Sequence, residues 1–218
     1  MKTSRWILTL VLMLTITPTF AQGSADPRMD PAGQGPGEAG LTAEMQAWMA
    51  AGLPNEHHEH LSRMAGEWDM QLKMWMEPGA PLTEFTGETS NTMIMSGRFL
   101  QSQISSELGG QQLESMGLEG YDNVKKKHIS LFIDNSGTAM QLSEGECSEG
   151  GKVITSWSES LDPVSGKITK MKSRLTIVSD DRYIFEAWEQ GPDGEFIRKG
   201  EITHTRKPDT RTGKGDKQ

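Results

Sequence analysis

The segment from Glu56 to His60 (EHHEH) concentrates side chains that can ligate a metal ion. On a helix, His57 and His60 stand three residues apart and Glu56 and His60 four apart, so either pair would share a face. A closed zinc site needs four ligands, which is more than one helix offers here. The zinc-protease spacing is also missing, because Ser62 stands where the second His of that motif belongs. We therefore expect neither a metal nor a cofactor at this cluster.

Arg98 and His204 are polar residues in alternating segments whose neighbouring inward positions are apolar. Arg98 shares a face with Leu100, and a buried guanidinium needs a partner because desolvating an unpaired charge is costly. That partner is either a ligand carboxylate, bound through two parallel hydrogen bonds, or Glu186. His204 is either an interior histidine with an ordinary hydrogen bond or a proton donor or metal ligand. An enzyme using Glu186 and His204 needs both in one water-accessible pocket.

Cys147 is the only cysteine, so the chain cannot form an internal disulfide. It follows Glu144 and Glu146, and nearby carboxylates raise the pKa of a thiol, which argues against a nucleophilic cysteine. The sequence also lacks a nucleophile elbow and a phosphate-binding loop. Catalysis is therefore not the leading interpretation.

The first 21 residues are typical of a signal peptide. Lys2 and Arg5 precede an apolar run from residue 6 to residue 16, Pro18 follows, and residues 19–21 (TFA) have the small residues of a cleavage site. The run is shorter than the roughly 20 residues that span a bilayer. We therefore expect an exported protein, periplasmic or secreted, without membrane attachment once residues 1–21 are removed.

The chain is acidic, with a formal net charge of −8, and removal of residues 1–21 takes away two basic residues and no acidic one. An acidic chain without a basic stripe is not expected to bind nucleic acid or an anionic membrane. A small molecule remains as the expected partner class. The sequence does not specify an oligomeric state.

The rest of the chain divides by composition and period into a flexible linker, short helices, a β-domain and a disordered tail. In chain order these are residues 22–40, 41–64, 65–207 and 208–218. Thr42 and Asn55 are the expected N-caps of the helices. The helical period changes to an alternation of two at Gly66-Glu67-Trp68.

Beyond Trp68, short alternating runs separated by turn residues predict antiparallel strands. Met70 and Leu72 share the face of Trp68, so they are expected to point inward. The expected strands cover residues 68–76, 86–95, 98–108, 113–118, 128–133, 139–143, 153–160, 168–178, 183–189 and 196–206. Eight to ten short strands with one or two short N-terminal helices predict an all-β antiparallel sandwich or barrel.

Several short motifs follow one another between residues 55 and 207. They are HxxLxxMxGxW from His58, GRFL from Gly97, GYDN from Gly120, Asp134, GK from Gly166, DDR from Asp180, PDG from Pro192 and EIxxTRK from Glu201. In this order they resemble a bacterial family known as domain of unknown function 1579. One departure is His204, where an aromatic residue such as Tyr is expected.

The resemblance implies a lipocalin-like (calycin) barrel, which agrees with the strand pattern, and it implies no reaction. In such a barrel, Trp68 of the first strand, entered through Gly66, closes one end. Arg206 of the last strand is then expected to stack across Trp68 as a cation–π pair. These three residues are therefore assigned to barrel closure.

The leading interpretation is a binding module that holds a small apolar or amphipathic molecule inside the barrel. Abundant methionine would suit a loose apolar ligand, although it also fills irregular cores. The candidate ligand contacts are Arg98, Met70, Leu72, Glu186 and His204. One alternative is a solid barrel that docks a partner through the helix at residues 41–53, using Trp48 and Met49. The other is the enzyme with Glu186 and His204.

Overall fold

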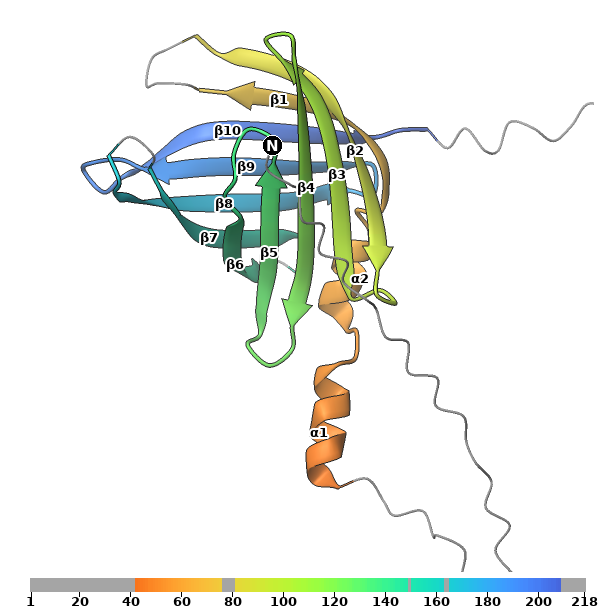
Figure 1. The fold of residues 1–218 in the computed structure, drawn as a ribbon. Helices are drawn as coiled ribbons and strands as arrows, with labels where there is room; N and C mark the ends of the chain where they lie inside the picture. Colours follow the sequence, from red (N-terminus) through yellow and green to blue (C-terminus); the bar gives the residue numbers. More distant parts are fainter. Residues whose placement is uncertain (1–41, 76–80, 149, 163–164, 209–218) are drawn as a thin grey trace, which may run out of the picture. The chain divides into compact units, whose positions relative to one another are not determined.

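The computed structural model describes residues 42–75, 81–148, 150–162 and 165–208. Within these ranges, two helices precede ten strands (Figure 1). The helices are α1 (Ala43–Ala51) and α2 (Glu56–Ser62). The strands are β1 (Gly66–Met74), β2 (Thr83–Ile94), β3 (Phe99–Leu108), β4 (Gln111–Asp122), β5 (Lys127–Asp134), β6 (Gln141–Ser148), β7 (Val153–Leu161), β8 (Ile168–Ser179), β9 (Arg182–Gln190) and β10 (Phe196–Arg206). The predicted signal peptide and linker, and residues 209–218 of the predicted tail, lie outside the described residues.

The strands form one closed antiparallel barrel, so the expected all-β barrel fold is confirmed. Each strand pairs with its neighbours along the chain, and β1 pairs with β10 to close the wall. Between β3 and β4, Gly109 and Gly110 have φ values of 60° and 81°, which the two-residue hairpin requires and glycine adopts without steric cost. This simple order places the start of β1 and the end of β10 at the same end of the barrel.

The observed strand boundaries differ most from the expected ones at β6. It was expected at residues 139–143 and spans Gln141–Ser148. Along this strand the inward positions Ser143, Gly145 and Cys147 are small, while Glu144 and Glu146 point outward. A strand with small rather than large apolar residues on its inner face lacks the alternation by which strands are recognised in a sequence.

One end of the barrel is filled, and α2 covers it. Leu61 and Met64 are 0 % and 2 % exposed and pack against Trp68, which is 1 % exposed. The same core cluster continues into the strands with Leu100, Ile154, Ile177 and Tyr183. Because α2 has only 7 residues, it gains most of its stability from this packing rather than from helix propensity.

α1 makes little contact with the barrel. Thr42 caps it as expected, since its hydroxyl accepts a hydrogen bond from the Met45 backbone N–H at 3.2 Å. No residue of α1 is buried, and Trp48 is 75 % exposed. Neither of the two described helices combines the length and apolar character needed to cross a membrane.

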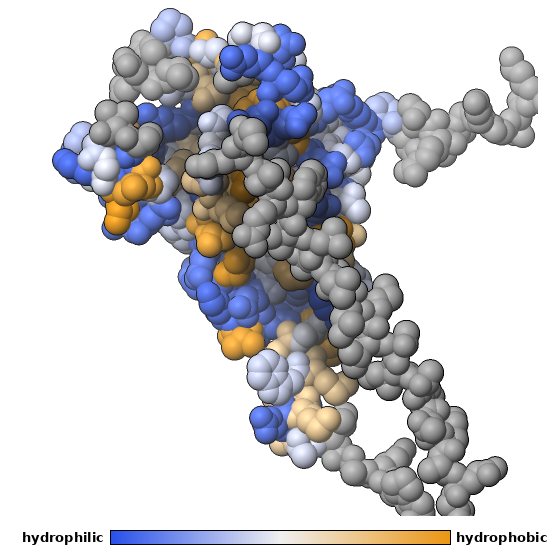
Figure 2. All heavy atoms as spheres, in the orientation of Figure 1, coloured by the Kyte–Doolittle hydropathy of each residue, from blue (hydrophilic) through white to orange (hydrophobic). Residues whose placement is uncertain are grey.

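The outer wall of the barrel is largely polar. Hydrophilic residues cover much of the visible described surface, and hydrophobic residues form separate patches (Figure 2). Outward positions of β1 include Glu67, Asp69 and Gln71, which are exposed, whereas inward Trp68 and Met70 are buried. The alternation that predicted β1 therefore reflects a solvated outer face and a packed inner face.

Candidate functional site

The strand register shows which residues point into the barrel, because side chains alternate between the two faces of a strand. Buried Trp68 fixes the inward side, and residues directly opposite on neighbouring strands share it. From Leu100, which is also buried and inward, the register runs around the wall through six positions. In order these are Glu119, Ser130, Ser143, Ser158, Met171 and Glu189.

Small side chains line the middle of the inner wall, and we call them the serine belt. Ser130 Oγ and Ser143 Oγ lie 2.5 Å apart, and Ser143 pairs with Ser158 on the next strand. The belt comprises Ser102, Gly117, Ser130, Ser143, Ser156, Ser158, Ser173, Ala187 and Gly200. Eight strands enclose a space just wide enough for side chains to fill, so ten strands with such small inward side chains leave more room.

The end of the barrel away from α2, called the mouth here, carries inward apolar side chains that solvent still reaches. Phe132 is 36 % exposed, and Phe85 and Met171 are half-buried. Directly opposite Phe132 on the next strand, Gln141 Nε2 donates a hydrogen bond to Ser158 Oγ at 3.1 Å and contacts Met171 Sδ at 3.1 Å. The described part of the mouth thus combines an apolar rim with amide and hydroxyl groups.

Met70 and Leu72 both point inward. This was expected, because they follow Trp68 by two and four residues and therefore have the same parity, which means that they share its face of the strand. Met70 is 4 % exposed and packs so closely against Gly87 that a Cβ there would come within 2.7 Å of Met70 Cε. Leu72 is half-buried and pairs with Phe85 of the mouth. Met70 therefore belongs to the filled floor, whereas Leu72 lies on the accessible wall above it.

The expected contact between Trp68 and Arg206 is present, with the guanidinium 4.1 Å from the ring centroid. Arg206 also donates hydrogen bonds to three backbone carbonyls, those of Ala65 (2.7 Å), Arg63 (2.6 Å) and Asp180 (2.8 Å). Two of these carbonyls follow α2 and one lies between β8 and β9. Arg206 therefore ties the covering helix to the barrel rim, as a positive group near a helix C-terminus should.

His204 lies inside the barrel, as its parity predicted, and is 4 % exposed. Its ring stacks on Tyr183 with centroids 4.1 Å apart, and its Nδ1 has no hydrogen-bond partner. Burial lowers the pKa of His204 to about 3, because the charged form would lose its hydration. The side chain therefore acts as a neutral aromatic packing residue at the closed end, which explains why it can replace the expected Tyr.

The predicted pairing of Arg98 with Glu186 is wrong. Arg98 lies in the turn before β3, and its Nε and Nη1 donate hydrogen bonds to the carbonyls of Gly52 and Met95. Glu186 faces outward and accepts hydrogen bonds from Arg174 at 2.8 Å and Arg198 at 2.6 Å. The parity argument failed for Arg98 because the chain turns there and the strand begins at residue 99.

The enzyme alternative fails on the same geometry. His204 is buried inside the barrel, while Glu186 points to the outer surface and forms ion pairs there. The two side chains therefore do not share a water-accessible pocket, which was the condition for acid–base chemistry between them. The five candidate ligand contacts do not converge, and Leu72 is the one that borders the mouth.

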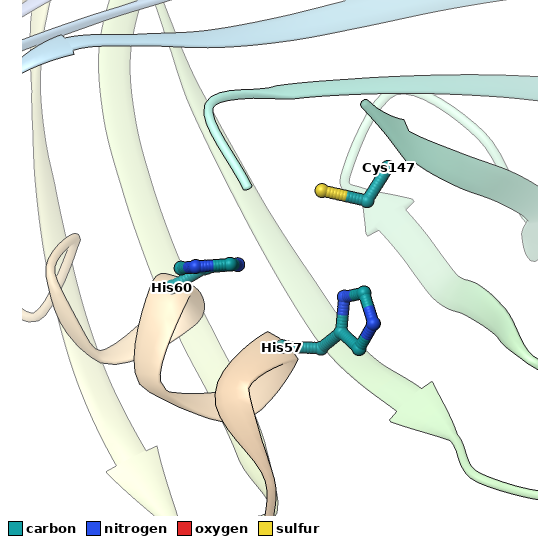
Figure 3. Close-up of side chains that lie close together, drawn as sticks. All are labelled: His57, His60 and Cys147. Atoms are coloured by element: carbon teal, nitrogen blue, oxygen red, sulfur yellow. The ribbon is translucent and has the colours of Figure 1, made fainter. Parts of the chain in front are cut away.

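The histidines of α2 meet Cys147 at the closed end of the barrel. Ligand atoms of His57, His60 and Cys147 all lie within 4.8 Å of one another, a grouping found among the described residues (Figure 3). Burial lowers the pKa of His57, so its imidazole is neutral at pH 7. Burial, and after it the charges of Glu119 and Glu56, raises the pKa of the Cys147 thiol. The direction matches the sequence-based expectation, but the main cause is burial rather than the adjacent glutamates.

The sequence reasoning missed that Cys147 completes this grouping. It recognised His57 and His60 as one helix face but counted only ligands from that helix. Cys147 lies on the inner face near the end of β6, and α2 covers this end of the barrel. Parity along a correctly bounded β6 would have placed Cys147 inward, so the misjudged strand boundary concealed it.

Comparison with known proteins bears on the fold and the family. The model of the family described as "Protein of unknown function (DUF1579)" matches residues 53–206. Among curated proteins, no sequence matches the chain. The crystal structure of Rv2717c from M. tuberculosis is similar, with a TM-score of 0.51 at 15 % identity over 71 % of this chain and 99 % of that one. The S-type phycobiliprotein lyase CPES from Guillardia theta has a TM-score of 0.50 at 10 % identity over 70 % and 93 %.

Proposed function

Because this chain belongs to the DUF1579 family and folds as a closed ten-stranded barrel, we propose that it is an exported protein that binds a small, largely apolar molecule inside the barrel. The observation that carries the proposal is the contrast between the two ends. Trp68 is 1 % exposed at the end covered by α2, whereas Phe132 at the mouth is 36 % exposed although it points inward. The molecule would therefore enter at the mouth and rest on the filled floor.

The lining of the interior suggests what the ligand would be. The apolar side chains of the mouth would cover its hydrophobic body, since ligand sites are lined mainly by apolar groups with a few polar ones. The hydroxyls of the serine belt, Ser143 and Ser158 among them, would hydrogen-bond to its polar atoms. Serine side chains are uncharged, and the carboxylates on the same inner face, Glu119 and Glu189, would repel an anion. The lining therefore favours a neutral or weakly polar molecule over an anionic one.

Native mass spectrometry of the protein purified from the exported fraction of its own host tests the proposal directly. A small molecule that co-purifies in a one-to-one complex is expected. Spectra that hold only the unliganded chain, together with failure of the probe experiment below, would refute the proposal.

A variant pair tests where the molecule binds. Ser143→Phe places a large ring in the serine belt, and Glu144→Phe places the same ring on the outer wall one residue away. With a neutral apolar fluorescent probe such as N-phenyl-1-naphthylamine, Ser143→Phe should abolish the fluorescence gain and Glu144→Phe should retain it. If the interior were filled, Ser143→Phe would instead destabilise the fold by about 1–3 kcal/mol through overpacking. Urea unfolding of both variants separates these outcomes.

A second candidate function uses α1 as a docking helix. Its apolar side chains are accessible, with Trp48 75 % and Met49 58 % exposed, and no residue of the helix is buried. The end of α1 is tied to the barrel, since Asn123 Nδ2 donates a hydrogen bond to the Ala51 carbonyl at 2.9 Å, but the exposed Trp48 and Met49 support a docking role for the rest of the helix. Co-purification of a partner with the wild type, and its loss in a variant carrying both Trp48→Ala and Met49→Ala, would support this function over ligand binding.

A further inference from the structure

His57, His60 and Cys147 bring two imidazoles and a thiol together from two distant parts of the chain. The histidines project from α2 toward the end of β6, where the thiol points back at them (Figure 3). All three ligand atoms lie within 4.8 Å of one another. Metal–nitrogen and metal–sulfur bonds of about 2.0–2.3 Å would need the atoms to approach a little more closely, which side-chain rotations can supply.

Two of the potential ligand atoms have no other use in the fold. The Nδ1 atoms of His57 and His60 are both buried, and neither has a hydrogen-bond partner. Buried polar atoms normally have a hydrogen-bond partner, so a buried nitrogen without one is a candidate ligand for an ion. Here two unpaired nitrogens occur side by side, next to a thiol. His58 differs, because its Nδ1 accepts a hydrogen bond from the Asn55 backbone N–H at 3.0 Å.

The surroundings are shaped to hold the ligands in place. A Cβ at Gly151, whose φ is +84°, would lie 2.0 Å from His60 Nδ1, so glycine is needed to make room for this ring. His57 stacks on Tyr121, with centroids 3.8 Å apart and planes 15° from parallel. The helix itself is anchored, since Asn55 Nδ2 donates a hydrogen bond to Asn123 Oδ1 at 2.7 Å. Such supporting contacts fix the orientation of metal ligands in known sites.

We propose that His57, His60 and Cys147 form a binding site for a transition-metal ion of the Zn²⁺ class. Neutral imidazole and thiolate are the ligands that zinc and its neighbours prefer, while Mg²⁺ and Ca²⁺ prefer oxygen. Three protein ligands leave one tetrahedral position open for a water or a small ligand, as in catalytic zinc sites. The site joins α2 to β6 and is separate from the mouth, so it extends beyond the proposed ligand-binding function.

Cobalt titration tests the site without any assumption about activity. The full-length mature protein, purified with chelator and reductant, would be titrated with Co²⁺ and followed by absorption. We expect a thiolate-to-cobalt charge-transfer band in the near ultraviolet and the visible bands of tetrahedral Co²⁺, saturating at one ion per chain. Zn²⁺ should displace the cobalt and remove both signals.

Three variants distinguish this site from adventitious binding. Cys147→Ser should remove the charge-transfer band, and His60→Gln should weaken Co²⁺ binding at least about 100-fold, because even outer-shell partners are worth 10–100-fold. His58→Gln is the matched control on the same helix. Glutamine at this position can preserve the capping box, so its affinity should stay within about twofold of wild type.

The outcomes are separable from changes in folding. Far-ultraviolet circular dichroism identifies any variant that fails to fold, and His60→Gln decides the matter if Cys147→Ser is such a case. Folded wild-type protein that gives no thiolate band with saturating Co²⁺ would overturn the proposal. So would cobalt binding that is unchanged in Cys147→Ser and His60→Gln.

Discussion

Arg206 should be among the most costly side chains to replace in this barrel, and Arg206→Lys is the sharpest way to show it. The substitution keeps the positive charge but loses the planar fork that reaches three carbonyls and stacks on Trp68. A lysine ammonium placed near Trp68 can reach one of the carbonyls of Arg63 and Ala65 at a time. Two charged hydrogen bonds and part of the cation–π contact are therefore lost.

The size of the effect follows from these contacts. A hydrogen bond to a charged group contributes about 1.5–3 kcal/mol, and partial exposure of Arg206 reduces this figure. We expect the free energy of unfolding to fall by about 2–4 kcal/mol, measured by urea unfolding with circular dichroism. Lys207→Ala is the control, because Lys207 pairs with exposed Glu88 at 2.7 Å and such surface pairs are worth less than about 1 kcal/mol. Equal losses in the two variants would refute the role assigned to Arg206.

Two further predictions concern the same end of the barrel. Since the pKa of His204 is lowered to about 3, the unfolded chain takes up a proton between pH 3 and about pH 6.5 that the folded chain does not. The free energy of unfolding should therefore fall by about 3 kcal/mol through this residue between about pH 6.5 and pH 4.5. Urea unfolding at about pH 7 and at about pH 4.5 measures this loss, and it should be absent in His204→Phe. Gly66→Ala should destabilise more than Gly97→Ala, because both have positive φ but only the Cβ at Gly66 would meet Arg206 Nη1, at 2.6 Å. Equal unfolding free energies in the two glycine variants would contradict this account of Gly66.

Local sequence signals predicted helices and strands well where one feature, such as a capping residue or an alternation of apolar and polar residues, determines the local structure. Asn55 was expected to cap α2, and its Oδ1 accepts a hydrogen bond from the His57 backbone N–H at 3.0 Å. The alternation after Gly66 predicted β1 and the inward side of Trp68, because burial on one face imposes a period of two. The family resemblance added the stacking of Arg206, which depends on two strands that meet only when the barrel closes.

The sites were harder to predict, because their residues lie at positions where the local rules give no signal. Arg98 fits the parity of β3 but lies one residue before it, in a turn where φ is positive at Met95 and Ser96. The serine belt carries hydroxyls on the inner face, so it weakens the apolar alternation that marks a strand. Cys147 joins His57 only through the closure of the barrel, and sequence spacing holds no trace of that contact.

The inner face of β6 shows why the two proposed sites can be tested independently. Ser143 belongs to the serine belt and Cys147 to the metal-binding group, with Gly145 between them on the same face. A Cβ at Gly145 would lie 2.2 Å from Ser156 Oγ, so the wall is closely packed at this level and Gly145 is itself buried. Ser143 and Cys147 are four residues apart on this strand, roughly 13 Å along it, so the two sites lie at different depths of the barrel. A ring at position 143 should therefore block the ligand while leaving the ligands of the metal site in place, and loss of the thiol should do the reverse.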